Sequence, residues 1–127
     1  MNEGEFKTAA VKLVRKVPNA YAHRIEDKFG VGFPDVIVKL PEFAWCFIEV
    51  KIVRGRYFSP TPRQLIELQR ISLAGNCFAL MHGVDLATKT LYFDEAVEKV
   101  DTTTCFQSTR PFPQALRDYL TWLTTER

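Results

Sequence analysis

An aspartate, a glutamate and a lysine in the first half of the chain have the types and the spacing for metal-assisted chemistry. Glu49 follows Asp35 by fourteen residues, and Lys51 stands two positions after Glu49. Two carboxylates placed side by side repel each other, and one pKa rises unless a cation separates them. Hard divalent ions such as Mg²⁺ or Mn²⁺ take oxygen ligands of this kind. Lys51 could then orient or deprotonate an attacking water, or stabilise a developing anion.

A β-hairpin is the element that would bring these three side chains together. Residues 35–40 and 44–52 are rich in Val, Ile and Phe, which is typical of buried strands. If the hairpin is symmetric about Glu42, the two carboxylates lie opposite each other, with their Cβ atoms about 5 Å apart. The lysine shares this face because side chains alternate along a strand. One face would therefore present two carboxylates and an ammonium between hydrophobic strands.

Each of these residues also has a plainer structural explanation. An Asp after Pro34 often only makes a turn, and a Glu and a Lys two positions apart are common on strands. Glu49 and Lys51, however, interrupt the apolar run 45–52, where ionised groups are rarely buried without a partner. The combination therefore favours a functional role over a structural one.

The periodicity of the rest of the chain predicts the elements around this hairpin. They are a helix over residues 3–17 that Pro18 ends, a strand at 21–25, a glycine-bearing turn at 30–34, a helix from Pro62 to about 73, strands at 77–82 and 90–93, and a helix over about 113–124. The order is typical of an α/β fold and predicts a mixed β-sheet of about five strands flanked by helices. At 127 residues the chain is expected to form one domain, 1–127.

Three signals mark the start of the helix that follows the hairpin. Thr61 is a suitable N-cap, Pro62 suits the first helical position, and Gln64 completes a capping box. Gly75 and Asn76 provide a good stop for the same helix. Gln64 therefore has a structural role whether or not it also belongs to a site.

Composition excludes several classes of protein. The chain is 46% hydrophobic and 25% charged, which excludes a disordered tail, a fibrous repeat and a disulfide scaffold. It has no 18-residue apolar run and begins without an apolar signal core, so we expect an intracellular protein without a membrane span. Cys46, Cys77 and Cys105 are read as reduced thiols, because they form no zinc pattern and no disulfide framework. No nucleotide-binding motif is present, so no nucleotide cofactor is expected.

Positive charge is concentrated in the half of the chain that holds these motifs. Residues 1–64 carry 11 Lys and Arg against 7 Asp and Glu, whereas residues 65–127 carry 6 against 8. This distribution favours a polyanionic partner. The candidate phosphate contacts, for which a solvated surface is the alternative, are Arg54, Arg56, Arg63, Lys12 and Lys16. Both histidines lack partners at ligand spacing and are expected to be structural.

The motif Pro34-Asp35 … Glu49-Val50-Lys51 resembles the signature of the PD-(D/E)XK, or restriction-endonuclease-like, nuclease superfamily. The surrounding segments are similar to its VRR-NUC branch, which is related to Holliday junction resolvases. The segments that carry this similarity are Gly32–Ile37, Phe47–Lys51, Ser59–Gln64 and Gly75–Leu80. The resemblance covers about residues 3–83 in the family's order, and it implies a restriction-endonuclease-like core.

The resemblance implies a role for each matching position. Asp35, Glu49 and the carbonyl of Val50 would bind Mg²⁺ or Mn²⁺, Lys51 would be the catalytic lysine, and Gln64 would reach back toward the site. The family also uses a glutamate on its first helix, for which this chain offers Glu3 and Glu5. With 100° per residue, Glu3 lies about 50° from the centre of the helix's apolar stripe and Glu5 about 110°. Glu3 is therefore the favoured ligand.

The function implied by the resemblance is metal-dependent endonuclease activity on DNA phosphodiester bonds. Within the family it points to branched DNA, such as four-way junctions, and hence to recombination and repair. A homodimer is expected, because two symmetric sites suit a junction with two strands to cut. A compact nuclease without a fused module is typical of a phage or mobile element. Two alternatives stay open: a nuclease of the same fold that acts on other DNA, and a non-catalytic DNA-binding subunit.

Overall fold

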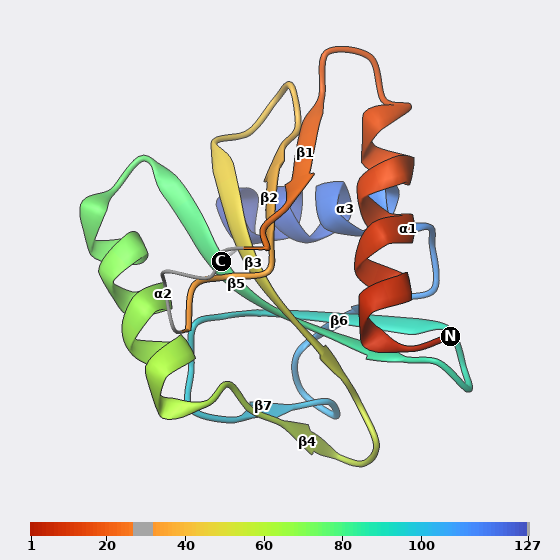
Figure 1. Ribbon diagram of the computed structural model, residues 1–127, viewed down its shortest axis with the longest axis vertical. Coiled ribbons are helices and arrows are strands. Elements are labelled where there is room, and N and C mark those ends of the chain that lie inside the picture. The colour runs from red at the N-terminus through yellow and green to blue at the C-terminus, as the bar shows by residue number, and fades with distance from the viewer. Residues whose placement is uncertain (27–31, 127) are drawn as a thin grey trace.

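A six-stranded mixed sheet forms the centre of the computed structural model, which describes residues 1–26 and 32–126. Along the described chain the elements are α1 (Glu3–Arg15), β1 (Tyr21–Arg24), β2 (Val36–Lys39), β3 (Trp45–Ile52), β4 (Tyr57–Phe58), α2 (Pro62–Ala74), β5 (Cys77–Asp85), β6 (Thr90–Glu95), β7 (Val100–Asp101), β8 (Phe106–Ser108) and α3 (Phe112–Thr125). The strand order is β1-β2-β3-β5-β6-β8, and β4 pairs with β7 in a separate two-stranded sheet (Figure 1). The predicted mixed α/β fold is confirmed.

Helices cover both faces of the central sheet. On one face, α1 and α3 pack against the larger hydrophobic core, to which they contribute residues such as Val14 and Leu116. On the other face, α2 packs with β4 and β7 over a smaller core that includes Leu68 and Val100. Figure 1 shows α2 apart from α1 and α3, along the crossover that joins the parallel strands β3 and β5. The sheet is thus buried on both sides near β3 and β5, as parallel pairing requires.

The register of the β2–β3 hairpin is the predicted one. Val36 pairs with Ile48 and Val38 pairs with Cys46, so the hairpin is symmetric about position 42. These four side chains are buried against the larger core. The alternate positions, which carry the acidic residues and the lysine, therefore point to the face that α2 shares.

The helix starts follow their capping signals. At α2, the Thr61 side chain accepts the backbone N–H of Gln64 and the Gln64 side chain accepts that of Thr61, so the predicted capping box is confirmed. A second capping box joins Asn2 and Glu5 at the start of α1. The first helix ends at Arg15 and not at residue 17, because the position before Pro18 disfavours helical backbone.

Three short strands were not predicted from the sequence. The segment 54–59, for which no element was predicted, contains β4, and β7 and β8 lie in the last third of the chain. Strands of two or three residues carry too short a pattern to be recognised, and their pairing depends on distant partners. The predicted turn at 30–34 falls partly outside the described residues. Within those residues, each helix is shorter or more polar than a membrane crossing requires.

Candidate active site

The two predicted carboxylates meet where β2 begins beside β3. Asp35 directly precedes β2, and its Oδ2 accepts the backbone N–H of Val50 at 2.9 Å. Glu49 lies in β3 beside Asp35, close enough for each side chain to shift the pKa of the other. Only 1% of Glu49 is exposed, whereas the Asp35 side chain retains 20% of its exposure. The hairpin thus places a buried and a half-buried carboxyl group side by side, as its symmetry predicts.

Glu49 is the most constrained acidic group of this pair. Its Oε2 accepts a hydrogen bond from Gln64 Nε2 at 3.1 Å, but its buried Oε1 accepts none from the described residues. Burial raises the pKa of Glu49 to about 9, helped by the hydrogen bond and charge of Asp35 and opposed by the charges of Lys51 and Lys7. A buried carboxyl group with an unpartnered oxygen costs free energy unless a proton or a cation neutralises it.

Asp35 is the group of the pair that keeps its charge. Burial alone would raise its pKa, but hydrogen bonds from Glu49, Lys7 and the Val50 amide outweigh burial and lower it. The pKa values of the two carboxyl groups are therefore pushed apart, as expected for acids that share one site. Two adjacent acids whose pKa values shift in opposite directions are typical of a functional site, and an ordinary hydrophobic core rarely contains such a pair.

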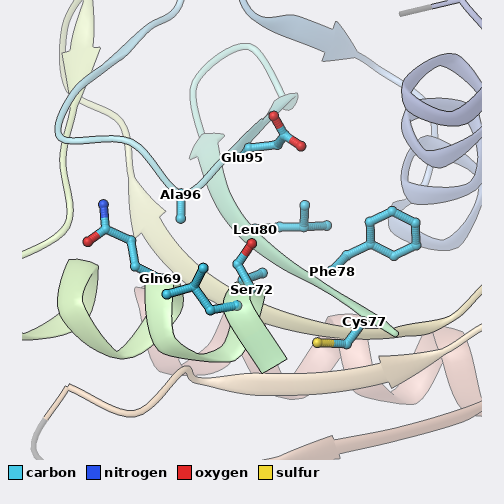
Figure 2. Close-up of a pocket in the computed structure, with 9 residues that line it drawn as sticks. Gln69, Ser72, Cys77, Phe78, Leu80, Glu95 and Ala96 are labelled. Atoms are coloured by element: carbon cyan, nitrogen blue, oxygen red, sulfur yellow. The ribbon is translucent and has the colours of Figure 1, made fainter. Parts of the chain in front are cut away.

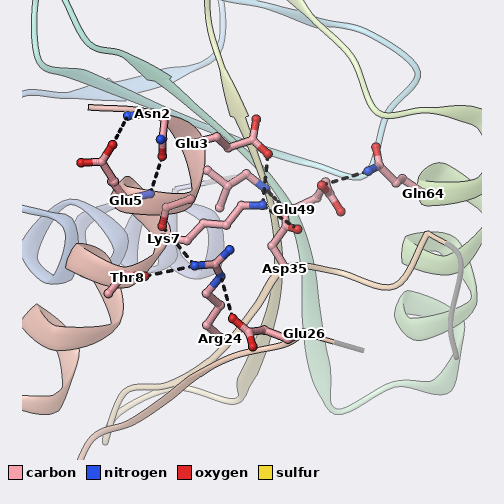
Figure 3. A network of polar contacts seen from close by, with 12 residues as sticks. Asn2, Glu3, Glu5, Lys7, Thr8, Arg24, Glu26, Asp35, Glu49 and Gln64 are labelled. Carbon is pink, nitrogen blue, oxygen red and sulfur yellow. Dashed lines mark hydrogen bonds and ion pairs between the residues drawn. The ribbon is translucent and has the colours of Figure 1, made fainter. Parts of the chain in front are cut away.

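Gln64 performs both of the roles that its sequence position allows. Its Oε1 accepts the Thr61 N–H at 2.8 Å, while its Nε2 donates to Glu49 (Figure 3). The segment that leads to Asp35 passes close to the start of α2 at Gly32, whose φ is +86°. A Cβ at Gly32 would lie 2.7 Å from the backbone carbon of Arg63, so only glycine permits this approach.

Lys7 is a site residue that sequence reasoning missed. Its Nζ lies 2.9 Å from Asp35 Oδ1 and 3.1 Å from Glu3 Oε1, and 12% of its side chain is exposed (Figure 3). Burial lowers the pKa of Lys7, but the hydrogen bonds and charges of Asp35 and Glu3 outweigh burial and raise it. The Glu3–Lys7 spacing of four was a visible signal for a helical ion pair, but nothing local pointed it at Asp35.

The structure separates the two candidate glutamates of the first helix. Glu5 turns away to close the capping box with Asn2, whereas Glu3 faces the site through Lys7. Glu3 does not reach the carboxyl pair directly: among residues 1–26 and 32–126, no three acidic, histidine or cysteine side chains converge as a metal cluster. Glu3 thus faces the carboxyl pair, as expected, but the ammonium group of Lys7 lies between Glu3 and Asp35.

Lys51 lies on the same strand face as Glu49, two positions farther along β3. It is half-buried and forms no hydrogen bond or ion pair with the part of the chain that the structure describes. Its charge nonetheless lowers the pKa of Glu49. Lys51 is therefore a cation close to the pair whose donors remain available to a ligand.

The predicted phosphate contacts are exposed, and within the described chain none of them forms a hydrogen bond or ion pair with the carboxyl pair. The exposed side chains are those of Arg54, Arg56, Arg63, Lys12 and Lys16. Arg56 already pairs with Asp101, with its Nη2 2.9 Å from Asp101 Oδ2. That ion pair joins the loop before β4 to β7, so Arg56 has a structural partner.

A separate pocket of about 460 Å³ lies between the last turns of α2, β5 and the end of β6. Figure 2 shows Gln69, Ser72, Cys77 and Glu95 around it. None of the predicted site residues lines this pocket. The carboxyl pair therefore lies outside this pocket.

The donor groups of the pair match the preferences of a hard divalent ion. Asp35 Oδ1 and Glu49 Oε1 are oxygens without a backbone donor, and the carbonyl of Val50 belongs to the residue that directly follows Glu49. Mg²⁺ and Mn²⁺ use few protein oxygens and complete their shells with water and phosphate. The unpartnered Oε1 of Glu49 is the observation that makes these residues fit such an ion.

Comparison with solved structures finds the same fold in a nuclease. The structure is similar to that of Hjc from Archaeoglobus fulgidus, described as a Holliday junction resolvase from an archaeal hyperthermophile. The TM-score is 0.63 at 13% identity, and the match covers 91% of this chain and 98% of the other. No protein-family model and no curated protein sequence matches the chain. The chain therefore has the restriction-endonuclease-like fold.

Proposed function

We propose that this chain is a metal-dependent endonuclease that hydrolyses DNA phosphodiester bonds. The observation that carries the proposal is the carboxyl pair, in which Glu49 is buried with Oε1 unpartnered beside a charged Asp35. Evolution of a stable core alone would not retain this arrangement, because a buried acid costs stability when it is not neutralised. The fold shared with a junction resolvase supports the same conclusion.

Asp35, Glu49 and the carbonyl of Val50 would hold Mg²⁺ or Mn²⁺. When bound, such an ion neutralises charge on the phosphoryl group and lowers the pKa of coordinated water. Lys51 Nζ would hold the attacking water or stabilise the phosphorane oxygens through its free donors. Gln64 Nε2 would keep Glu49 Oε2 in place, so that Oε1 stays directed at the ion.

Branched DNA is the proposed substrate, and the VRR-NUC branch is the proposed family. The support is the sequence resemblance together with the shared fold of the archaeal resolvase. Phosphate contacts would come from Arg54, Arg63, Lys12 and Lys16, which are exposed and form no ion pair within the described chain. A nuclease of this kind would act on DNA in the cytoplasm of a host cell, as the product of a phage or mobile element.

A homodimer of single-domain chains would place two sites on one junction. Two aromatic side chains are not available for its interface, because Tyr119 and Phe112 are 1% and 3% exposed in the chain's own core. Trp45 and Trp122 remain exposed. An isologous contact would therefore use one of these two tryptophans.

Cleavage of a labelled four-way junction and of a matched linear duplex tests the proposal. We expect paired cuts near the branch point with Mg²⁺ or Mn²⁺, and none with EDTA. Asp35→Asn should abolish the cuts, whereas Asp118→Asn, the same change in the surface ion pair with Arg110, should leave them unchanged. Metal-dependent cuts in linear DNA alone would contradict branched DNA as the substrate but would still support the proposed active site. DNA binding without any cleavage would contradict the nuclease and favour the non-catalytic subunit.

A further inference from the structure

Lys7 places an ammonium group against the Asp35 oxygen that a divalent ion would use. We infer that a divalent ion must displace the Lys7 ammonium to reach Asp35, so that this lysine sets the metal affinity of the chain. The inference rests on the proposed metal site and goes beyond it by naming the residue that competes with the ion. Neither the sequence resemblance nor the fold points to Lys7.

The contacts of Asp35 leave little choice about where a cation can approach. Its Oδ2 is taken by the Val50 N–H at 2.9 Å, so Oδ1 is the oxygen left for a ligand. Lys7 Nζ lies 2.9 Å from this Oδ1. An ammonium group and a divalent ion repel each other strongly at such distances, above all where the surroundings are partly buried. Metal binding at Oδ1 therefore opposes the ion pair with Lys7.

Glu3 explains why the ammonium is held and where it goes. Its Oε1 lies 3.1 Å from Lys7 Nζ on the side away from Asp35 (Figure 3). Glu3 is half-exposed, so a lysine released from Asp35 keeps a partner at the surface. Lys7 is thus a bridge between an outer and an inner carboxylate, and it separates the favoured first-helix glutamate from the carboxyl pair.

The helix that carries Lys7 is firmly placed. Arg24 of β1 donates to the carbonyl of Gly4 at 3.3 Å and to Thr8 Oγ1 at 3.1 Å, which ties the first turns of α1 to the sheet. The capping box of Asn2 and Glu5 fixes the helix start. Displacement therefore requires only rotation of the lysine side chain and no movement of the helix.

Binding of Mn²⁺ to the DNA-free protein, measured by isothermal titration calorimetry, tests the inference. Lys7→Met removes the charge at nearly constant length, and we expect it to bind Mn²⁺ about tenfold more tightly, or about 1.4 kcal/mol. Lys7→Arg keeps the charge and should not bind more tightly than the wild type. Lys39→Met removes a lysine at the opposite end of β2 and should match the wild type.

Thermal unfolding gives a second readout on the same proteins. In EDTA, Lys7→Met should melt lower than the wild type because the carboxylates of Glu3 and Asp35 lose their shared cation, and excess Mn²⁺ should raise its melting temperature by more. Lys7→Gln, which is neutral but still donates a hydrogen bond, answers the same question if Lys7→Met does not fold. If the folded neutral variants bind Mn²⁺ as tightly as the wild type or more weakly, the inference about Lys7 is wrong, but the proposed metal site still stands. If the folded wild type and variants all bind no Mn²⁺, the proposed metal site fails as well.

Discussion

Glu49 and His82 are the two polar side chains that the described core buries, and they lie back to back on neighbouring strands. Val50 pairs with His82 across β3 and β5, so Glu49 points to the face that α2 shares and His82 to the opposite face. Each has one buried atom without a hydrogen-bond partner among the described residues: Oε1 of Glu49 and Nε2 of His82. Burial disfavours the charged form of both groups.

Their surroundings differ in kind. His82 stacks on Phe93 at a centroid distance of 4.3 Å, with Phe6 and Phe112 against its ring, and its Nδ1–H donates to the carbonyl of Tyr92 at 2.8 Å. Glu49 instead has a second carboxyl group, two lysines and an amide around it. A buried polar group among aromatic rings is a structural element, as predicted for this histidine. One on which other polar groups converge is a candidate site.

The largest expected effect comes from replacing Glu49 and His82 in turn, because one variant should lose DNA cleavage and the other should lose stability. Glu49→Gln should lower metal-dependent DNA cleavage about 10²–10³-fold, because an amide replaces a metal-binding carboxylate. Its melting temperature should be equal or higher, since a buried acid is gone. His82→Asn should instead lower the melting temperature and keep cleavage within a few-fold at a temperature where it is folded. Equal losses of cleavage in both folded variants would break the comparison.

Acid should destabilise the protein through His82. Burial lowers its pKa to about 4, against about 6.5 in the unfolded chain, so protons bind the unfolded state more readily. The stability contributed by the neutral ring is fully present above about pH 6.5 and is lost as the pH falls toward 4, by about 3 kcal/mol in total. Urea unfolding at several pH values measures this slope. His82→Asn should have a lower free energy of unfolding at pH 7, and that free energy should change less between pH 6.5 and 4 than in the wild type. An unchanged pH dependence would show that another group causes the acid sensitivity.

The smallest expected effect separates the two roles of Gln64. Thr61→Ala and Gln64→Ala both break the capping box, and each should lower the free energy of unfolding by about 1 kcal/mol. Gln64→Ala also removes the donor to Glu49 Oε2, so it alone should reduce cleavage, by about tenfold. Chemical denaturation and initial cleavage rates measure the two effects. Equal cleavage by both variants would leave Gln64 with its capping role only.

The sequence by itself determined the parts of the molecule that depend on neighbours along the chain. The hairpin register follows from alternation and a short connection, and it brings Asp35 opposite Glu49 without reference to any other element. The start of α2 follows from Thr61, Pro62 and Gln64, whose effects act within one turn of helix. These local rules were enough to predict the carboxyl pair.

Only the tertiary structure decided how the pair is surrounded. Lys7 reaches Asp35 because α1 packs across the sheet, and Gln64 reaches Glu49 because the crossover returns α2 to β3. The two-residue strands β4 and β7 likewise exist through a partner more than forty residues away. Contacts between distant segments depend on how whole elements dock, which no local pattern encodes. The acidic pair was therefore visible in the sequence, and the cation that competes for it was not.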